Sequence, residues 1–131
     1  MRQAVSTGMA SAGNGPYSQA ILAGNYLYVS GQGPLDSTGD IVPGSIEEQT
    51  KLTLQNIREI VEAGGFTMDQ VVKVGVYLSD LQHFQRFNEV YVAFFQAPMP
   101  ARTCIEAGLN GILVEIDVIA YRQQVETKAS L

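Results

Sequence analysis

The chain has 131 residues, of which 46% are hydrophobic and only 16% are charged. This length predicts one domain over residues 1–131, because single domains usually contain about 100–150 residues. The composition excludes an intrinsically disordered chain. The shortage of charge favours burial of part of the surface in an oligomer, since exposed apolar patches are costly.

The formal net charge is −5, from eight basic and thirteen acidic residues. No basic run is present, which disfavours general nucleic-acid binding, because such binding uses Lys and Arg to neutralise phosphates. Cys104 is the single cysteine and His83 the single histidine, so an internal disulfide and a Cys/His metal cluster are excluded.

No apolar run has the roughly 18 residues of a membrane helix, and the N-terminus lacks the apolar region of a secretory signal. An unpaired cysteine fits a reducing compartment. We therefore expect a cytoplasmic protein that does not bind membranes, and Arg2 alone is weak support for an organellar address.

In chain order, the Gly-Asn-Gly-Pro run at 13–16 predicts a turn. Residues 20–22 and 25–30 predict a hairpin around Ala23-Gly24, because aromatic and β-branched residues favour strands. Residues 36–44 are rich in Gly, Asp, Ser, Thr and Pro and predict a loop.

A helix is predicted over Ile46–Ala63. Ser45 and Glu48 form a capping-box pattern, in which each side chain pairs with the other residue's backbone amide. Gly64-Gly65 ends the helix, since glycine readily adopts the left-handed conformation. Between these signals, apolar residues recur at helical spacing, at Ile46, Leu54, Ile57, Ile60 and Val61.

The alternation of Val72, Val74, Val76 and Leu78 predicts a half-buried strand. A second helix follows Asp80 and ends at the Ala-Pro-Met-Pro run at 97–100. It carries one aromatic stripe, formed by Phe84, Phe87, Tyr91 and Phe94 or Phe95.

A short strand over 103–107 and a final strand over Val114–Tyr121 complete the chain. In the final strand, Glu115, Asp117 and Ile119 lie on the face opposite the even-numbered residues. The order β-β-α-β-α-β-β predicts an α+β domain, a mixed sheet with two helices packed on one face.

Arg102 is the first candidate functional residue. It follows a Pro-Met-Pro run, in which two prolines stiffen the approach to a strand and remove backbone donors. A guanidinium held in this way suits bidentate capture of a carboxylate or phosphate. The alternative is a structural arginine that pairs with a nearby acid.

Glu115 is the second candidate, because its strand neighbours are apolar. A carboxylate beside a low-dielectric wall can act as a base or hold a water. The alternative is an exposed acid on an open sheet face. For Cys104, no adjacent histidine is predicted to activate the thiol, which favours a buried, inert side chain. His83 is interpreted as solvent-facing.

Several short segments, spread in order over about residues 15–122, carry one shared pattern. They are Gly15-Pro16-Tyr17-Ser18-Gln19-Ala20, Val29-Ser30-Gly31-Gln32, Asn56-Ile57, Ile60-Val61-Glu62-Ala63-Gly64-Gly65, Val72-Lys73-Val74, Phe87-Asn88-Glu89-Val90-Tyr91, Pro100-Ala101-Arg102-Thr103-Cys104 and Val114-Glu115-Ile116-Asp117-Val118-Ile119-Ala120. Together these segments resemble one family, the RidA reactive-intermediate deaminases, also called YjgF and labelled endoribonuclease L-PSP.

This resemblance implies a chorismate-mutase-like fold that assembles as a homotrimer with its sites in clefts between subunits. It implies a hydrolase that converts 2-imino or enamine acids, such as 2-iminobutanoate and 2-iminopropanoate, to 2-oxo acids and ammonia. These intermediates come from pyridoxal-phosphate dehydratases that act on serine or threonine. Neither a metal nor an organic cofactor is expected.

By position, the resemblance assigns Arg102 to the substrate carboxylate and Glu115 to the attacking water. Tyr17 corresponds to the tyrosine that lines the cleft, and Ser30 and Asn88 to polar residues of the site. Cys104 corresponds to a cysteine whose backbone, rather than its thiol, lies near the substrate.

One segment departs from the family. Members usually carry a Leu-Pro pair in a slightly longer loop before the glutamate, whereas this chain has Asn110 at the proline position. The departure puts the substrate range in doubt. A non-catalytic trimer that binds small carboxylates therefore stays open as an alternative. The family's older label suggests another, a ribonuclease or translation inhibitor, although the chain lacks paired histidines for phosphodiester cleavage.

Overall fold

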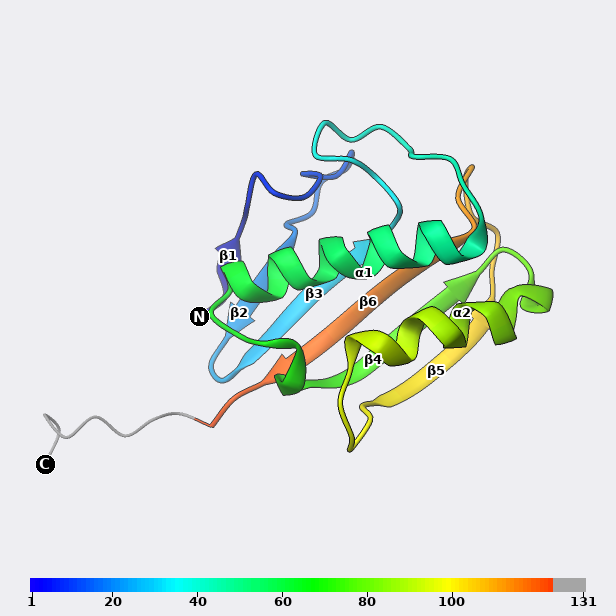
Figure 1. Ribbon diagram of the computed structural model, residues 1–131. Coiled ribbons are helices and arrows are strands. Elements are labelled where there is room, and N and C mark those ends of the chain that lie inside the picture. Colours follow the sequence, from blue (N-terminus) through cyan, green and yellow to red (C-terminus); the bar gives the residue numbers. More distant parts are fainter. Residues whose placement is uncertain (124–131) are drawn as a thin grey trace, which may run out of the picture.

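The computed structural model describes residues 1–123. They form one six-stranded sheet in the order β1-β2-β3-β6-β4-β5, with both helices across one face (Figure 1). All neighbouring strands are antiparallel except β4 and β5, which are parallel. The predicted α+β architecture is confirmed. Its elements are β1 (Gln3–Val5), β2 (Ala20–Ala23), β3 (Tyr26–Gln32), α1 (Ile46–Ala63), β4 (Val71–Leu78), α2 (Phe84–Tyr91), β5 (Ala101–Glu106) and β6 (Val114–Tyr121).

Helix α1 has the predicted bounds. The Ser45 hydroxyl accepts a hydrogen bond from the Glu48 amide at 3.1 Å, and the Glu48 carboxylate accepts one from the Ser45 amide at 2.9 Å. The reciprocal bonds satisfy two amides that a helix start leaves free. At the other end the chain turns at Gly65, whose φ of +83° disfavours any side chain.

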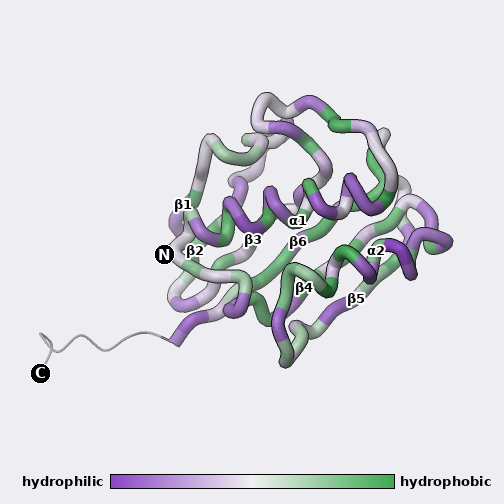
Figure 2. The backbone as a smooth tube through the Cα atoms, in the orientation of Figure 1, coloured by the Kyte–Doolittle hydropathy of each residue, from purple (hydrophilic) through white to green (hydrophobic). Residues whose placement is uncertain are grey.

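The core lies between the two helices and the sheet. Figure 2 shows apolar residues along the strands beneath the helices and hydrophilic ones on the outer turns of α1. Every residue of the predicted apolar stripe of α1 is buried, as are the even-numbered residues of β6. The odd-numbered residues of β6 and Lys73, Gly75 and Tyr77 of β4 lie on the opposite face, which no helix covers.

Several strand predictions need correction. Strand β1 was not predicted, because the three residues Gln3–Val5 are too few to show a pattern, and it forms only by pairing with β2. In β4 a register shift between Val71 and Lys73 buries Val71 and leaves Val72 44% exposed. Strand β5 covers Ala101–Glu106 rather than 103–107.

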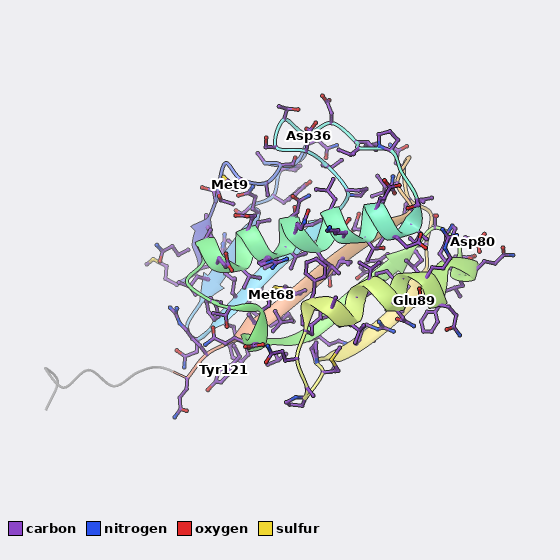
Figure 3. All side chains as sticks on the ribbon, in the orientation of Figure 1. Met9, Asp36, Met68, Asp80, Glu89 and Tyr121 are labelled. Atoms are coloured by element: carbon purple, nitrogen blue, oxygen red, sulfur yellow. The ribbon has the colours of Figure 1, made fainter. Side chains whose placement is uncertain are left out.

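The second helix is shorter than its aromatic stripe predicts. Helix α2 ends at Tyr91 and continues as a 3-10 turn over Val92–Phe94, after an earlier 3-10 turn over Leu81–His83. Figure 3 shows its side chains, with Glu89 labelled on α2 and Asp80 and Tyr121 at opposite ends of the sheet. Within residues 1–123, no helix is both long and apolar enough to cross a membrane.

Candidate functional site

Arg102 lies on the helix-covered face of the sheet, because it pairs with Val74 of the buried side of β4. Its Nη1 donates a hydrogen bond to Oδ1 of Asn88 at 2.8 Å. Its guanidinium carbon is 4.7 Å from the ring centre of Tyr91 and within 6 Å of the rings of Phe84 and Phe87. The predicted stiff arginine is therefore held by one amide and three aromatic rings of α2.

Arg102 has no acidic partner within the described chain. The one side-chain ion pair among residues 1–123 joins Arg86 to Glu47, at 2.7 Å, on the exposed surface between α2 and α1. The interpretation of Arg102 as half of a structural ion pair is thus wrong for this part of the chain. Its charge is half-buried and not neutralised, which is the condition for binding an anion.

Glu115 lies on the uncovered face of β6, across from Tyr77 of β4. Burial raises the pKa of its carboxyl group, and the nearby carboxylate of Asp117 raises that pKa further. The Tyr77 hydroxyl donates a hydrogen bond to Asp117 at 2.9 Å, which keeps the second carboxylate in place. A carboxyl group whose pKa is displaced towards neutrality suits proton transfer at ordinary pH.

The space around Glu115 depends on a glycine of β3. A Cβ atom at Gly31 would lie 2.5 Å from Oε2 of Glu115, closer than non-bonded atoms allow. Gly31 lies where the β3–β6 register shifts, between Val29 and Gln32. The irregular pairing and the missing side chain therefore leave room for the Glu115 carboxylate beside the backbone of β3.

Ser30 and Tyr17 are linked to this side of the sheet. The Ser30 hydroxyl donates a hydrogen bond to the carbonyl oxygen of Ser18 at 2.6 Å, and the Ser30 amide donates to the carbonyl of Gln19 at 2.9 Å. Tyr17, which is 47% exposed, borders a groove formed with residues 4–8 and 12. These bonds hold the segment with Tyr17 against the end of β3.

Cys104 lies on the same face as Arg102, across from Val76. Burial raises the pKa of its thiol, and the positive charge of Arg102 opposes this only in part. Cys104 is only partly buried, not buried as predicted. A thiol that stays protonated at neutral pH is a poor nucleophile, which supports the interpretation of an inert side chain. Among residues 1–123, no three His, Cys, Asp or Glu side chains gather as a metal site.

The loop with Asn110 joins β5 to β6. The Gln49 side chain of α1 accepts a hydrogen bond from the Leu113 amide at 2.8 Å, and Gly111 has a φ of +82°. Asn110 itself is exposed. A hydrogen bond to α1, rather than a proline, therefore holds the loop at its β6 end.

The six predicted site residues form two groups. Arg102 and Cys104 of β5 and Asn88 of α2 lie on the helix-covered side of the sheet. Glu115 lies on the other face, beside the Ser30-Gly31 segment of β3, and Tyr17 lies in the segment that is hydrogen-bonded to Ser30. One chain does not bring both groups into one cleft.

Sequence reasoning missed the aromatic contacts of Arg102 and the neighbours of Glu115. Phe84, Phe87, Asn88 and Tyr91 have the spacing i, i+3, i+4, i+7, which places them along one side of a helix. The sequence predicts the aromatic members of that stripe, but it gives no signal that they contact Arg102. Tyr77 and Asp117 were visible as outward-facing residues of their strands, but their hydrogen bond depends on the pairing of β4 with β6.

Within residues 1–123, this arrangement is an α+β fold with one sheet, two helices on a single face and, beneath the second helix, an arginine without an acidic partner. The family model described as Endoribonuclease L-PSP matches residues 7–122. The chain belongs to this family, which is the RidA family that the sequence resembles.

Curated relatives and solved structures agree over nearly the whole chain. A RutC family protein of Pyrococcus horikoshii is 44% identical and covers 94% of this chain and 100% of its own length. A mouse protein named 2-iminobutanoate/2-iminopropanoate deaminase is 42% identical, with 93% of each chain covered.

Two crystal structures show the same fold. One, of a Thermotoga maritima protein described as a putative endoribonuclease, superposes with a TM-score of 0.89 at 42% identity, covering 95% of this chain and 100% of that one. The other is the structure of TdcF from E. coli with bound serine. It gives a TM-score of 0.86 at 34% identity and covers 92% of this chain and 99% of that one.

Proposed function

We propose that the protein is a cofactor-independent deaminase that hydrolyses 2-imino and enamine acids, such as 2-iminobutanoate and 2-iminopropanoate, to 2-oxo acids and ammonia. The observation that carries the proposal is the half-buried Arg102 guanidinium, which has no acidic partner within residues 1–123. The mouse relative's name and the serine bound to E. coli TdcF support a small amino-acid-derived substrate.

The proposed site forms between two copies of the chain in a homotrimer. One copy contributes Arg102, Asn88 and the backbone of Cys104, and its neighbour contributes Glu115, Ser30 and Tyr17. The placement of Arg102 and Glu115 on opposite faces of the sheet supports this division. The uncovered face also carries the exposed rings of Tyr26 and Tyr28, which favours contact with another copy.

In the proposed reaction, Arg102 binds the substrate carboxylate and thereby orients the C=N carbon. Asn88 accepts one guanidinium hydrogen and fixes the rotation of that group. Glu115 takes a proton from water as the water oxygen bonds to the imine carbon, and the nitrogen of the resulting carbinolamine is protonated. The C–N bond then breaks, ammonia leaves, and the hydroxyl proton is lost to give the 2-oxo acid. An imine is already electrophilic, so orientation and water delivery supply most of what catalysis needs.

The direct test is release of ammonia and pyruvate from 2-aminoacrylate that a serine dehydratase generates in the same vessel. Loss of a charged anchor costs about 2–5 kcal/mol, so we expect Arg102→Ala to lower kcat/KM by at least about tenfold. Arg86→Ala is the matched control, because Arg86 lies on the exposed surface, paired with Glu47. An Arg102→Ala protein as active as the wild type would refute the proposed role.

Two further measurements separate the alternatives. A non-catalytic carboxylate-binding protein would show a pyruvate-dependent rise in Tm that requires Arg102, without any ammonia release. A ribonuclease would show RNA degradation that survives stringent purification and disappears in Glu115→Ala.

A further inference from the structure

We propose that Tyr91 is a positioning residue, whose ring holds the Arg102 guanidinium ready for a substrate carboxylate. The inference rests on the proposed function for its ligand. Its evidence is separate, since it comes from the packing of α2. Phe84, Phe87, Asn88 and Tyr91 form one stripe of that helix, and all four contact Arg102.

Tyr91 makes the closest ring contact of the three. Its ring centre is 4.7 Å from the guanidinium carbon, against 5.6 Å for Phe84 and 5.7 Å for Phe87. Tyr91 is only 4% exposed, whereas Phe84 is 38% exposed. A cation above a buried ring is held more strongly than one above an exposed ring, because less water competes for it.

The ring of Tyr91 is itself fixed. It packs against Phe87 with ring centres 5.5 Å apart and against Phe95 with ring centres 4.8 Å apart. The Tyr91 ring therefore cannot rotate away from Arg102 without displacing core side chains. A rigid support of this kind lowers the cost of ordering a long side chain when a ligand binds.

An aromatic support also preserves the positive charge. An acidic neighbour would hold Arg102 equally well but would compete with the substrate carboxylate for its N–H groups. The ring faces attract the cation without accepting strong hydrogen bonds, and Asn88 accepts from Nη1. A guanidinium has five N–H donors, so donors remain for a bidentate carboxylate.

The hydroxyl of Tyr91 provides a clean control. It is buried and has no hydrogen-bond partner within the described part of the chain. Tyr91→Phe therefore removes the hydroxyl without breaking a hydrogen bond there and keeps the ring. If the ring carries the effect, Phe at this position holds Arg102 as well as Tyr does.

The experiment compares Tyr91→Leu, Tyr91→Phe and Phe95→Leu in the full-length protein. Phe95→Leu is the matched packing control, because it removes a buried ring that touches Tyr91 but is not among the rings over Arg102. If Tyr91→Leu does not fold, Tyr91→Met replaces it. Each variant is first checked for the oligomeric mass of the wild type.

Two readouts are taken, the pyruvate dissociation constant and the arginine Nε–H resonance of Arg102, identified by its loss in Arg102→Gln. We expect Tyr91→Leu to weaken pyruvate binding about tenfold and to reduce the upfield ring-current shift of the Arg102 resonance. Tyr91→Phe should retain both properties, and Phe95→Leu should change both less than Tyr91→Leu does.

Three results would overturn the inference. They are an unchanged resonance and affinity in Tyr91→Leu, an equal loss in Phe95→Leu, and an equal loss in Tyr91→Phe. If the wild type binds no pyruvate, the proposed function fails, and the ring-current comparison alone still decides whether Tyr91 holds Arg102.

Discussion

Arg102 and Glu115 lie on opposite faces of one sheet, although β4 alone separates the strands that carry them. Arg102 points towards α2, and Glu115 points to the face without helices. The two groups cannot close around one small substrate within a single chain. We therefore propose that a second copy completes the site, an arrangement that would also account for the low share of charged residues.

Gly31→Ala should lower kcat about 10²-fold, because the new methyl group would lie 2.5 Å from Oε2 of Glu115 and displace its carboxylate. Steady-state kinetics with freshly generated 2-aminoacrylate measure the effect. Gly108→Ala is the control, since a Cβ atom there meets nothing within 4 Å. A folded Gly31→Ala protein with wild-type kcat would contradict the assigned position of Glu115.

Glu115→Gln should stabilise the folded chain at neutral and higher pH. Burial and Asp117 raise the pKa of the Glu115 carboxyl in the folded state. Between the ordinary and the raised pKa, the folded chain holds a proton that the unfolded chain has released, so wild-type stability falls as pH rises through this window. Below the ordinary glutamate pKa of about 4.5, Glu115 is protonated in both the folded and the unfolded chain, so its titration no longer affects stability.

Thermal unfolding from pH 4 to 8 measures this effect. We expect Glu115→Gln to raise Tm at pH 8 and to raise it by less as pH falls. Glu89→Gln, the same change at an exposed position of α2, serves as the control for the altered net charge. A constant or inverted difference in Tm would show that Glu115 does not lie in the environment described.

Asn56→Ala should lower the free energy of unfolding by about 2 kcal/mol. The buried Asn56 amide donates hydrogen bonds to the carbonyls of Gly33 and Leu35, at 3.0 and 2.9 Å, and so fixes the chain where it leaves β3. Urea denaturation measures the loss. Gln55→Ala, at an exposed position of α1, should change stability by less than about 0.5 kcal/mol. Equal effects of the two substitutions would contradict the role of the amide.

The elements that the sequence predicts best are those with local signals. Helix α1 has the predicted bounds because Ser45, Glu48 and the glycine pair act through neighbouring residues. Strand β6 follows its alternation along its whole length, since both of its edges are paired. The same locality explains why Arg102 could be singled out from the prolines before it.

Features that depend on pairing between distant segments were not predictable. The register shift that exposes Val72 arises where β4 meets β6, and β1 exists only beside β2. The α2 stripe could be read as helical, but its contact with Arg102 requires β5 to lie beside β4. Local sequence features singled out Arg102 and Glu115, the resemblance supplied the other four site residues, and only the sheet topology divides the six between two faces.

The most direct test of the shared site mixes two inactive variants. Arg102→Ala and Glu115→Gln chains are co-expressed with different tags, and trimers that contain both are isolated by tandem purification. A site that takes Arg102 from the Glu115→Gln chain and Glu115 from the Arg102→Ala chain is intact. A trimer that contains both variants has three sites, and one of them is intact. We therefore predict about one third of wild-type ammonia release. Mixed trimers no more active than either parent would contradict a site built from two chains.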